Sequence, residues 1–83
     1  MTELDYVTLE VITPDGKDVG PGAVSRKICE QQASTELLKA GLPAGDIHEV
    51  AARLANVTDK EEIRIGAYTF ISKTMARSMT DRF

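Results

Sequence analysis

The widest apolar pattern in the chain lies near its end, over residues 59–79. At about 100° per residue, the apolar side chains of this segment spread over an arc of roughly 240°, whereas a surface helix usually shows a stripe little wider than about 100°. Thr58 and Glu61 have the spacing of a capping box at the start of the segment. We therefore predict one long central helix with more apolar surface than a small chain can cover by itself.

The start of the chain has the pattern of a β-hairpin. Residues 6–12 alternate between apolar and polar positions, which is typical of a strand with one buried face. Residues 13–16, Thr-Pro-Asp-Gly, have the composition of a tight turn. We expect residues 17–19 to form a short return strand, which Gly-Pro-Gly at 20–22 brings to an end.

Two shorter helices are predicted between this hairpin and the long helix. Residues 25–40 favour helix, and Gly-Leu-Pro at 41–43 supplies a left-handed cap residue, an apolar residue and a helix breaker. Residues 46–55 begin with a second capping-box pattern and carry a one-sided apolar stripe. The predicted fold class is α+β, with an N-terminal β-hairpin followed by three α-helices, the last one long and central.

Length and composition indicate one small globular domain spanning residues 1–83. Apolar residues make up 42% of the chain and charged residues 28%, which is an ordinary balance for a folded domain. The formal net charge is −3. A general nucleic-acid binder gains most of its affinity from Lys and Arg at phosphates, so we do not expect a nucleic-acid partner.

The sequence offers little chemistry to a catalytic, metal or cofactor site. Cys29 and His48 are the only cysteine and histidine, so the chain cannot supply a Cys and His zinc set, and we expect Cys29 to be a small buried apolar residue. We predict no enzyme activity, no metal and no cofactor. Without a signal peptide pattern or an apolar run of about 20 residues, we expect a cytoplasmic protein that does not bind membranes.

A DNA-binding regulator is the alternative hypothesis. Residues 51–58 are similar to the first helix and turn of a helix-turn-helix motif, so residues after them would form the recognition helix. That helix would present Asp59, Lys60, Glu61 and Glu62 near its N-terminus, where a reader of base edges needs Arg, Lys, Asn or Gln. The net negative charge of this turn disfavours DNA binding.

The preferred hypothesis is a non-enzymatic protein-protein interaction module. We expect a small acidic inhibitor or adaptor, of the kind carried by phages and mobile elements, that forms a homodimer and binds a protein partner through the long C-terminal helix. Methionine side chains adapt to irregular partner surfaces, and small residues allow close approach. The predicted partner-binding residues lie on one side of that helix: Ile65, Tyr68, Ser72, Met75, Ala76 and Met79.

Overall fold

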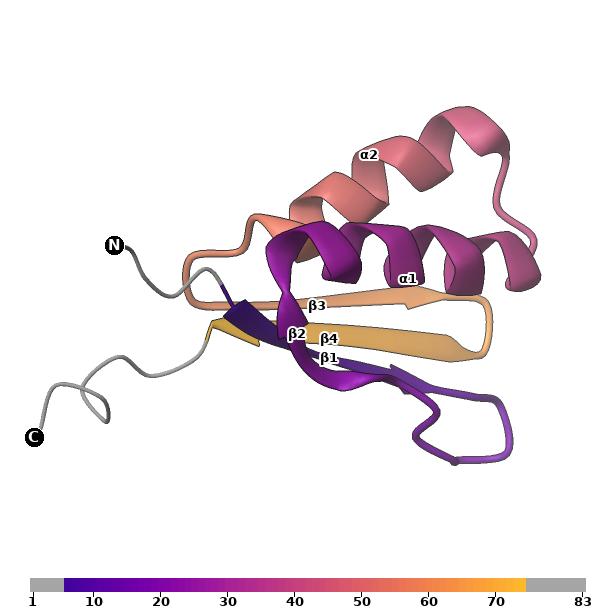
Figure 1. Cartoon of the computed structure of the whole chain (residues 1–83). Coiled ribbons are helices and arrows are strands. Elements are labelled where there is room, and N and C mark those ends of the chain that lie inside the picture. Colours follow the sequence, from indigo (N-terminus) through magenta and orange to yellow (C-terminus); the bar gives the residue numbers. More distant parts are fainter. Residues whose placement is uncertain (1–5, 75–83) are drawn as a thin grey trace, which may run out of the picture.

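The computed structural model describes residues 6–74 and has two layers, a four-stranded sheet and two helices on one of its faces (Figure 1). All neighbouring strands are antiparallel, and their order across the sheet is β2-β1-β4-β3. The two hairpins, β1–β2 and β3–β4, therefore meet in the middle of the sheet, where β1 pairs with β4. In chain order the elements are β1 (Tyr6–Ile12), β2 (Gly22–Ser25), α1 (Arg26–Lys39), α2 (Ala44–Ala55), β3 (Lys60–Ile65) and β4 (Tyr68–Thr74).

The predicted architecture of one hairpin followed by three helices is wrong, because the structure has two helices between two hairpins. The expected long helix is replaced by β3, a turn and β4, and its last residues, 75–79, lie outside the described part of the chain. In β3, Glu61, Ile63 and Ile65 alternate with more exposed residues, which is a period of two. A period-two pattern drawn on a helical wheel spreads over a wide arc, which explains the unusual apolar surface of the predicted helix.

The turn between β3 and β4 is the local signal that decides against a helix. Ile65 pairs with Tyr68, so only Gly66 and Ala67 lie between the strands. Gly66 has a φ of 60°, and no described residue other than glycine has a positive φ. This combination fits a type II′ turn, which places glycine first and matches the twist of a two-residue hairpin.

The first hairpin is confirmed at its turn but not at its return strand. Gly16 donates to the carbonyl of Thr13 at 2.9 Å, and its φ is 89°. The return strand is β2, which begins at Gly22, the last residue of the Gly-Pro-Gly segment, and the predicted strand at 17–19 is reduced to an isolated bridge between Ile12 and Asp18. The chain before β2 lies very close to the backbone of β1 at Gly20. Only glycine fits there, because a Cβ at this position would lie 2.5 Å from the carbonyl oxygen of Leu9.

The two helices agree with the prediction more closely. The Ser25 side chain caps α1 by accepting from the Ile28 N–H at 3.2 Å. At the other end, Gly41 has a φ of 91° and donates to Leu38, while Leu42 donates to Leu37. These bonds form a Schellman motif, as the glycine and the apolar residue after it predict.

The core lies between the helices and the sheet. Helix α1 packs on β1 and β2, α2 packs on β4, and the two helices pack on each other. The predicted apolar stripe of α2 is buried or half-buried, and Cys29 is fully buried as expected. The buried apolar residues are Val7, Leu9, Val11, Cys29, Ala33, Leu37, Ile47, Ala51, Leu54, Ala55, Val57 and Phe70.

Candidate functional site

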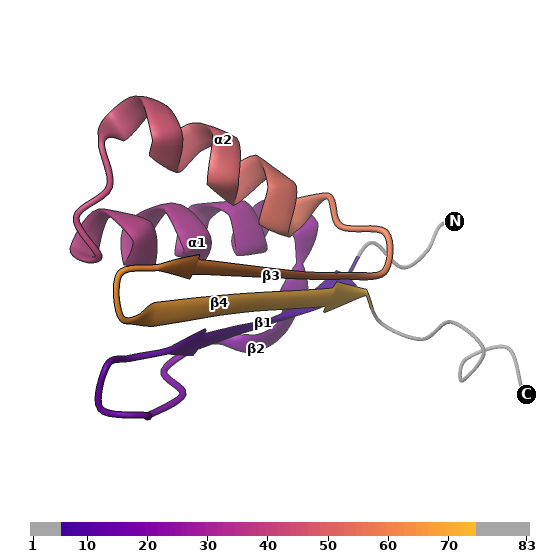
Figure 2. The same cartoon turned by 180° about the vertical axis from the view of Figure 1, so that it is seen from behind.

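Strand β3 forms one edge of the sheet, and the view from behind shows it outside β4 (Figure 2). Among the described residues, no element pairs with the outer side of β3. Thr74 N–H donates to the carbonyl of Asp59 at 3.0 Å, and these two residues are directly opposite each other in the β3–β4 register. Directly opposite residues that exchange hydrogen bonds alternate along an antiparallel pair with residues that do not.

This alternation fixes which backbone groups of β3 are available. Counting in steps of two from Asp59, the residues Glu61, Ile63 and Ile65 direct their N–H and C=O groups toward β4. The residues between them direct these groups away from the sheet, and we call their outward N–H and C=O groups the β3 edge. The β3 edge belongs to Lys60, Glu62 and Arg64.

The opposite edge of the sheet differs from this one. Strand β2 has four residues, against six in β3, and it runs directly into α1 at Arg26. Helix α1 also packs against β2. The β3 edge is therefore the longer of the two, and neither helix continues from it.

The side chains of the β3 edge lie on the face of the sheet opposite the helices, which we call the open face. They alternate in charge along the strand, as Lys60, Glu62 and Arg64. Arg64 Nε lies 3.7 Å from Glu62 Oε2, and these side chains are 77% and 41% exposed. Charges on an edge strand commonly prevent unspecific strand pairing, so any partner strand here must match this charge order.

The helix side of β3 is only partly covered. Glu61, Ile63 and Ile65 remain half-buried, whereas Phe70 and Ser72 of the neighbouring strand are fully buried. Helix α2 packs on β4, and it reaches β3 through the ion pair between Arg53 and Glu61. A strand added at the β3 edge would therefore also cover apolar surface on the helix side of the sheet.

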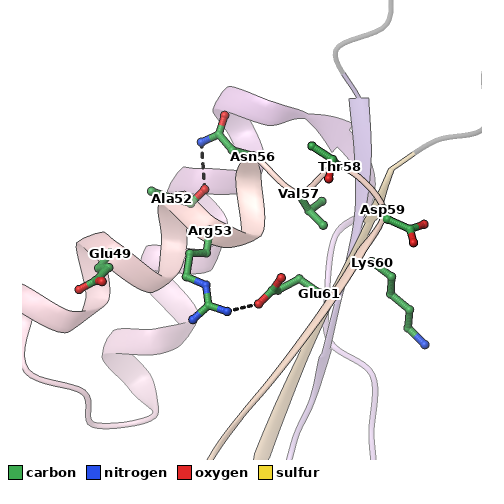
Figure 3. Close-up of a pocket in the computed structure, with 9 residues that line it drawn as sticks. All are labelled: Glu49, Ala52, Arg53, Asn56, Val57, Thr58, Asp59, Lys60 and Glu61. Atoms are coloured by element: carbon green, nitrogen blue, oxygen red, sulfur yellow. Dashed lines mark hydrogen bonds and ion pairs between the residues drawn. The ribbon is translucent and has the colours of Figure 1, made fainter.

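A hollow of about 520 Å³ lies where the C-terminal half of α2 faces the beginning of β3 (Figure 3). Arg53 of α2 and Glu61 of β3 point toward each other across it and form an ion pair. Lys60 points to the other side of the strand. The hollow is lined by Glu49, Ala52, Arg53, Asn56, Val57, Thr58, Asp59, Lys60 and Glu61.

A buried polar cluster lies on the inner side of the same elements. Ser72 Oγ donates to the Leu54 carbonyl at 2.5 Å, and Cys29 Sγ lies 3.7 Å from the same oxygen. Burial raises the pKa of the Cys29 thiol, against the smaller opposing effect of its hydrogen bond with Ser72. A protonated, buried thiol is a poor nucleophile, so this cluster serves the packing of α2 on β4.

The predicted partner-binding residues are not on one helical face. Ile65 and Tyr68 lie opposite each other beside the Gly66 turn, and both are half-buried. Ser72 is fully buried under α2 and is closed to a partner in this fold. Met75, Ala76 and Met79 lie outside the described residues.

The segment expected to form a recognition helix is also a strand. Helix α2 ends at Ala55, and Lys60–Ile65 forms β3, so the helix-turn-helix interpretation of this segment has no second helix. Over residues 6–74, no group of three or more His, Cys, Asp or Glu residues is placed to hold a metal ion. No helix in this range is long and apolar enough to cross a membrane.

Sequence reasoning missed the edge strand, although a signal for it was present. From Glu62 to Ile65 charged and apolar residues alternate, and Gly66 follows directly. Comparison of the chain with protein-family models, with curated proteins and with solved structures found no match.

Proposed function

We propose that this chain is a non-enzymatic protein-interaction module, in the class of small adaptors and inhibitors, that binds its partner by strand addition at the β3 edge. The observation that carries the proposal is the direction of the Lys60, Glu62 and Arg64 backbone groups, which face away from β4 where no described element meets them. Main-chain hydrogen bonds to such an edge give affinity, and side-chain fit gives specificity.

Both faces of β3 support a strand as the bound element. On the open face, an added strand would place a side chain opposite each charge of the β3 edge. On the helix side, it would lie beside Ile63 and Ile65 and cover their half-buried side chains. Burying apolar area of this kind contributes about 25 cal/mol per Å².

This surface replaces the helical face expected from the sequence. Ile65 belongs to both interpretations, because it lies on β3 and remains half-buried. The proposed class, a small acidic inhibitor or adaptor, still rests on the size and net charge of the chain. Only the proposed binding surface changes, from a helix face to the edge of a sheet.

Site-specific photo-cross-linking in the native host tests the proposal. A photoreactive side chain at position 64 should form adducts with a protein partner, because Arg64 lies on the β3 edge. The matched control is position 73, since Lys73 is exposed on the same open face but lies on the inner strand β4. Equal adducts at both positions would contradict strand addition.

The substitution Glu62→Pro sharpens this test. Proline cannot donate a hydrogen bond, and it is tolerated on an edge strand where the N–H faces outward. The Glu62 N–H points away from β4, so the fold should persist while the adducts from position 64 are lost. Adducts that survive Glu62→Pro in a folded protein would show that the partner does not use the backbone of β3.

A further inference from the structure

The charge order of the β3 edge has a self-complementary register. Two copies of β3 can pair antiparallel about a twofold axis, and the axis position decides which residues face each other. With the axis at Ile63, Glu62 of each copy lies opposite Arg64 of the other. The same register places Ile63 opposite Ile63 and Glu61 opposite Ile65 on the helix side.

Neighbouring registers are poorer. The backbone groups of Lys60, Glu62 and Arg64 face outward, so these residues must lie opposite even-numbered residues of the other copy to form hydrogen bonds. An axis at Glu62 places Glu62 opposite itself and Lys60 opposite Arg64, and an axis at Arg64 places Arg64 opposite itself. Like charges directly opposite each other destabilise strand pairs.

One further register joins opposite charges but loses overlap. An axis at Glu61 places Lys60 opposite Glu62 on the open face. It also brings two Glu61 side chains together on the helix side, and it leaves Ile63 and Ile65 beyond the paired residues of β3. The axis at Ile63 therefore combines opposite charges and apolar contact, and no other allowed register overlaps more residues of β3.

The helices leave room for this pairing. Strands in a sheet lie about 4.8 Å apart, so two β4 strands separated by two β3 strands would lie about 14 Å apart. Helix α2 lies over β4, and packed helices need only about 8–10 Å between their axes. Where α2 packs over β4, the two α2 helices would therefore lie farther apart than packed helices need.

We infer that the partner at the β3 edge is a second copy of this chain, bound antiparallel with Ile63 at the twofold axis, so that two four-stranded sheets become one continuous sheet. The inference rests on the proposed function, since both use the β3 edge. A contact of one strand with one strand is small among specific interfaces, so we expect a dimer with a dissociation constant in the micromolar range, about 1–100 μM.

Charge reversal tests the register directly. Sedimentation equilibrium should show that Glu62→Arg and Arg64→Glu each weaken the dimer about tenfold or more, because each variant creates two like-charge contacts. The double variant Glu62→Arg with Arg64→Glu should restore wild-type dimerisation. An equimolar mixture of the two single variants should form a mixed dimer, since one chain then offers two Arg and the other two Glu.

The mixed dimer also shows that both single variants are folded. Lys73→Glu is the control for net charge, because Lys73 lies on the open face of an inner strand, and this change should leave the dimer intact. Amide hydrogen exchange should slow at Glu62 and Arg64 as the protein concentration rises. Wild-type chain that stays monomeric at about 1 mM would overturn the inference.

Other outcomes separate the inference from the proposed function. If the charge variants dimerise like the wild type while Glu62→Pro abolishes the dimer, the β3 edge is used in another register, so only the inference fails. If the wild type is monomeric and position 64 cross-links to an extended segment of a different protein, the second copy is the wrong partner and the proposed function stands. If Glu62→Pro changes neither dimerisation nor cross-linking, the inference and the proposed function are both wrong.

Discussion

The hydroxyl of Ser72 on β4 donates a hydrogen bond to the carbonyl oxygen of Leu54 in the last turn of α2, across 2.5 Å. Both residues are fully buried. The last four carbonyls of a helix have no partner within it, so this bond gives the buried Leu54 carbonyl a stronger donor than the Cys29 thiol. The contact also holds α2 against β4, the neighbour of the edge strand β3.

Ser72→Ala should destabilise the fold by about 1–3 kcal/mol, because the Leu54 carbonyl would keep only the weak Cys29 thiol as a partner. Urea unfolding followed by circular dichroism measures this loss. Thr8→Val is the matched control, since the Thr8 hydroxyl donates to Lys73 at 3.3 Å in an exposed position, and its loss should cost less than about 0.5 kcal/mol. Equal costs for the two variants would contradict this role for Ser72.

Arg26, the first residue of α1, binds backbone carbonyls at the C-terminal end of α2. Its Nη1 atom lies 2.6 Å from the carbonyl oxygen of Ala55 and 3.0 Å from that of Val57. Arg26→Gln should cost about 1.5–3 kcal/mol, since hydrogen bonds from charged groups are stronger than neutral ones. Thermal unfolding of Arg26→Gln beside Lys27→Gln measures the difference, because Lys27 is an exposed neighbour on α1. A Lys27 variant as unstable as the Arg26 variant would contradict this assignment.

Two glycines should respond to alanine in opposite directions. Gly20→Ala would place a Cβ 2.5 Å from the Leu9 carbonyl oxygen and 2.8 Å from Glu10 Cα, so we expect a loss of about 3 kcal/mol or more. Gly45→Ala, in the first turn of α2, meets nothing within 4 Å and should gain about 0.4–1 kcal/mol. Chemical denaturation of both variants checks the signs, and a tolerated Gly20→Ala would contradict the close approach of Gly20 to the backbone of β1.

Cys29 should make stability depend on alkaline pH. Burial raises the pKa of its thiol in the folded state, so the folded chain keeps a proton that the unfolded chain releases above about pH 8.5. The unfolded state then binds fewer protons, and the free energy of unfolding falls with rising pH by at most about 1.4 kcal/mol per unit. Wild type and Cys29→Ala compared from about pH 7 to about pH 9.5 isolate this slope, which should be absent from the variant. Parallel profiles would contradict the raised pKa.

The first hairpin turn and both helices could be predicted because their signals are local. The Gly41 cap, the one-sided stripe of α2 and the alternation of β1 all act within a few residues of where they appear. The second hairpin was missed for two reasons. Thr58 and Glu61 have the spacing of a capping box, and the apolar residues were plotted only at the period of a helix, where a wide arc was interpreted as a broad apolar face. Gly66 inside the predicted helix was the contrary sign.

The candidate site could not be predicted, because it depends on contacts between distant segments. That β3 is an edge follows from the pairing of β1 with β4, which no local pattern records. The direction of the Glu62 backbone follows in turn from its register with Ile71. The alternating charges of Lys60, Glu62 and Arg64 were visible in the sequence. They indicate a pairing edge only once this segment is known to be a strand at the edge of the sheet.

The pairing of β1 with β4 joins residues almost as far apart as the described chain allows, since Val7 lies opposite Thr74. During synthesis, β1 leaves the ribosome early, and it cannot pair with β4 until β4 has also emerged. Two-stranded hairpins are marginal alone, so the native state cannot form while the chain is still growing through β3. Nascent molecules of this protein should therefore complete the sheet only after β4 emerges, and the long sequence separation between β1 and β4 should slow this step.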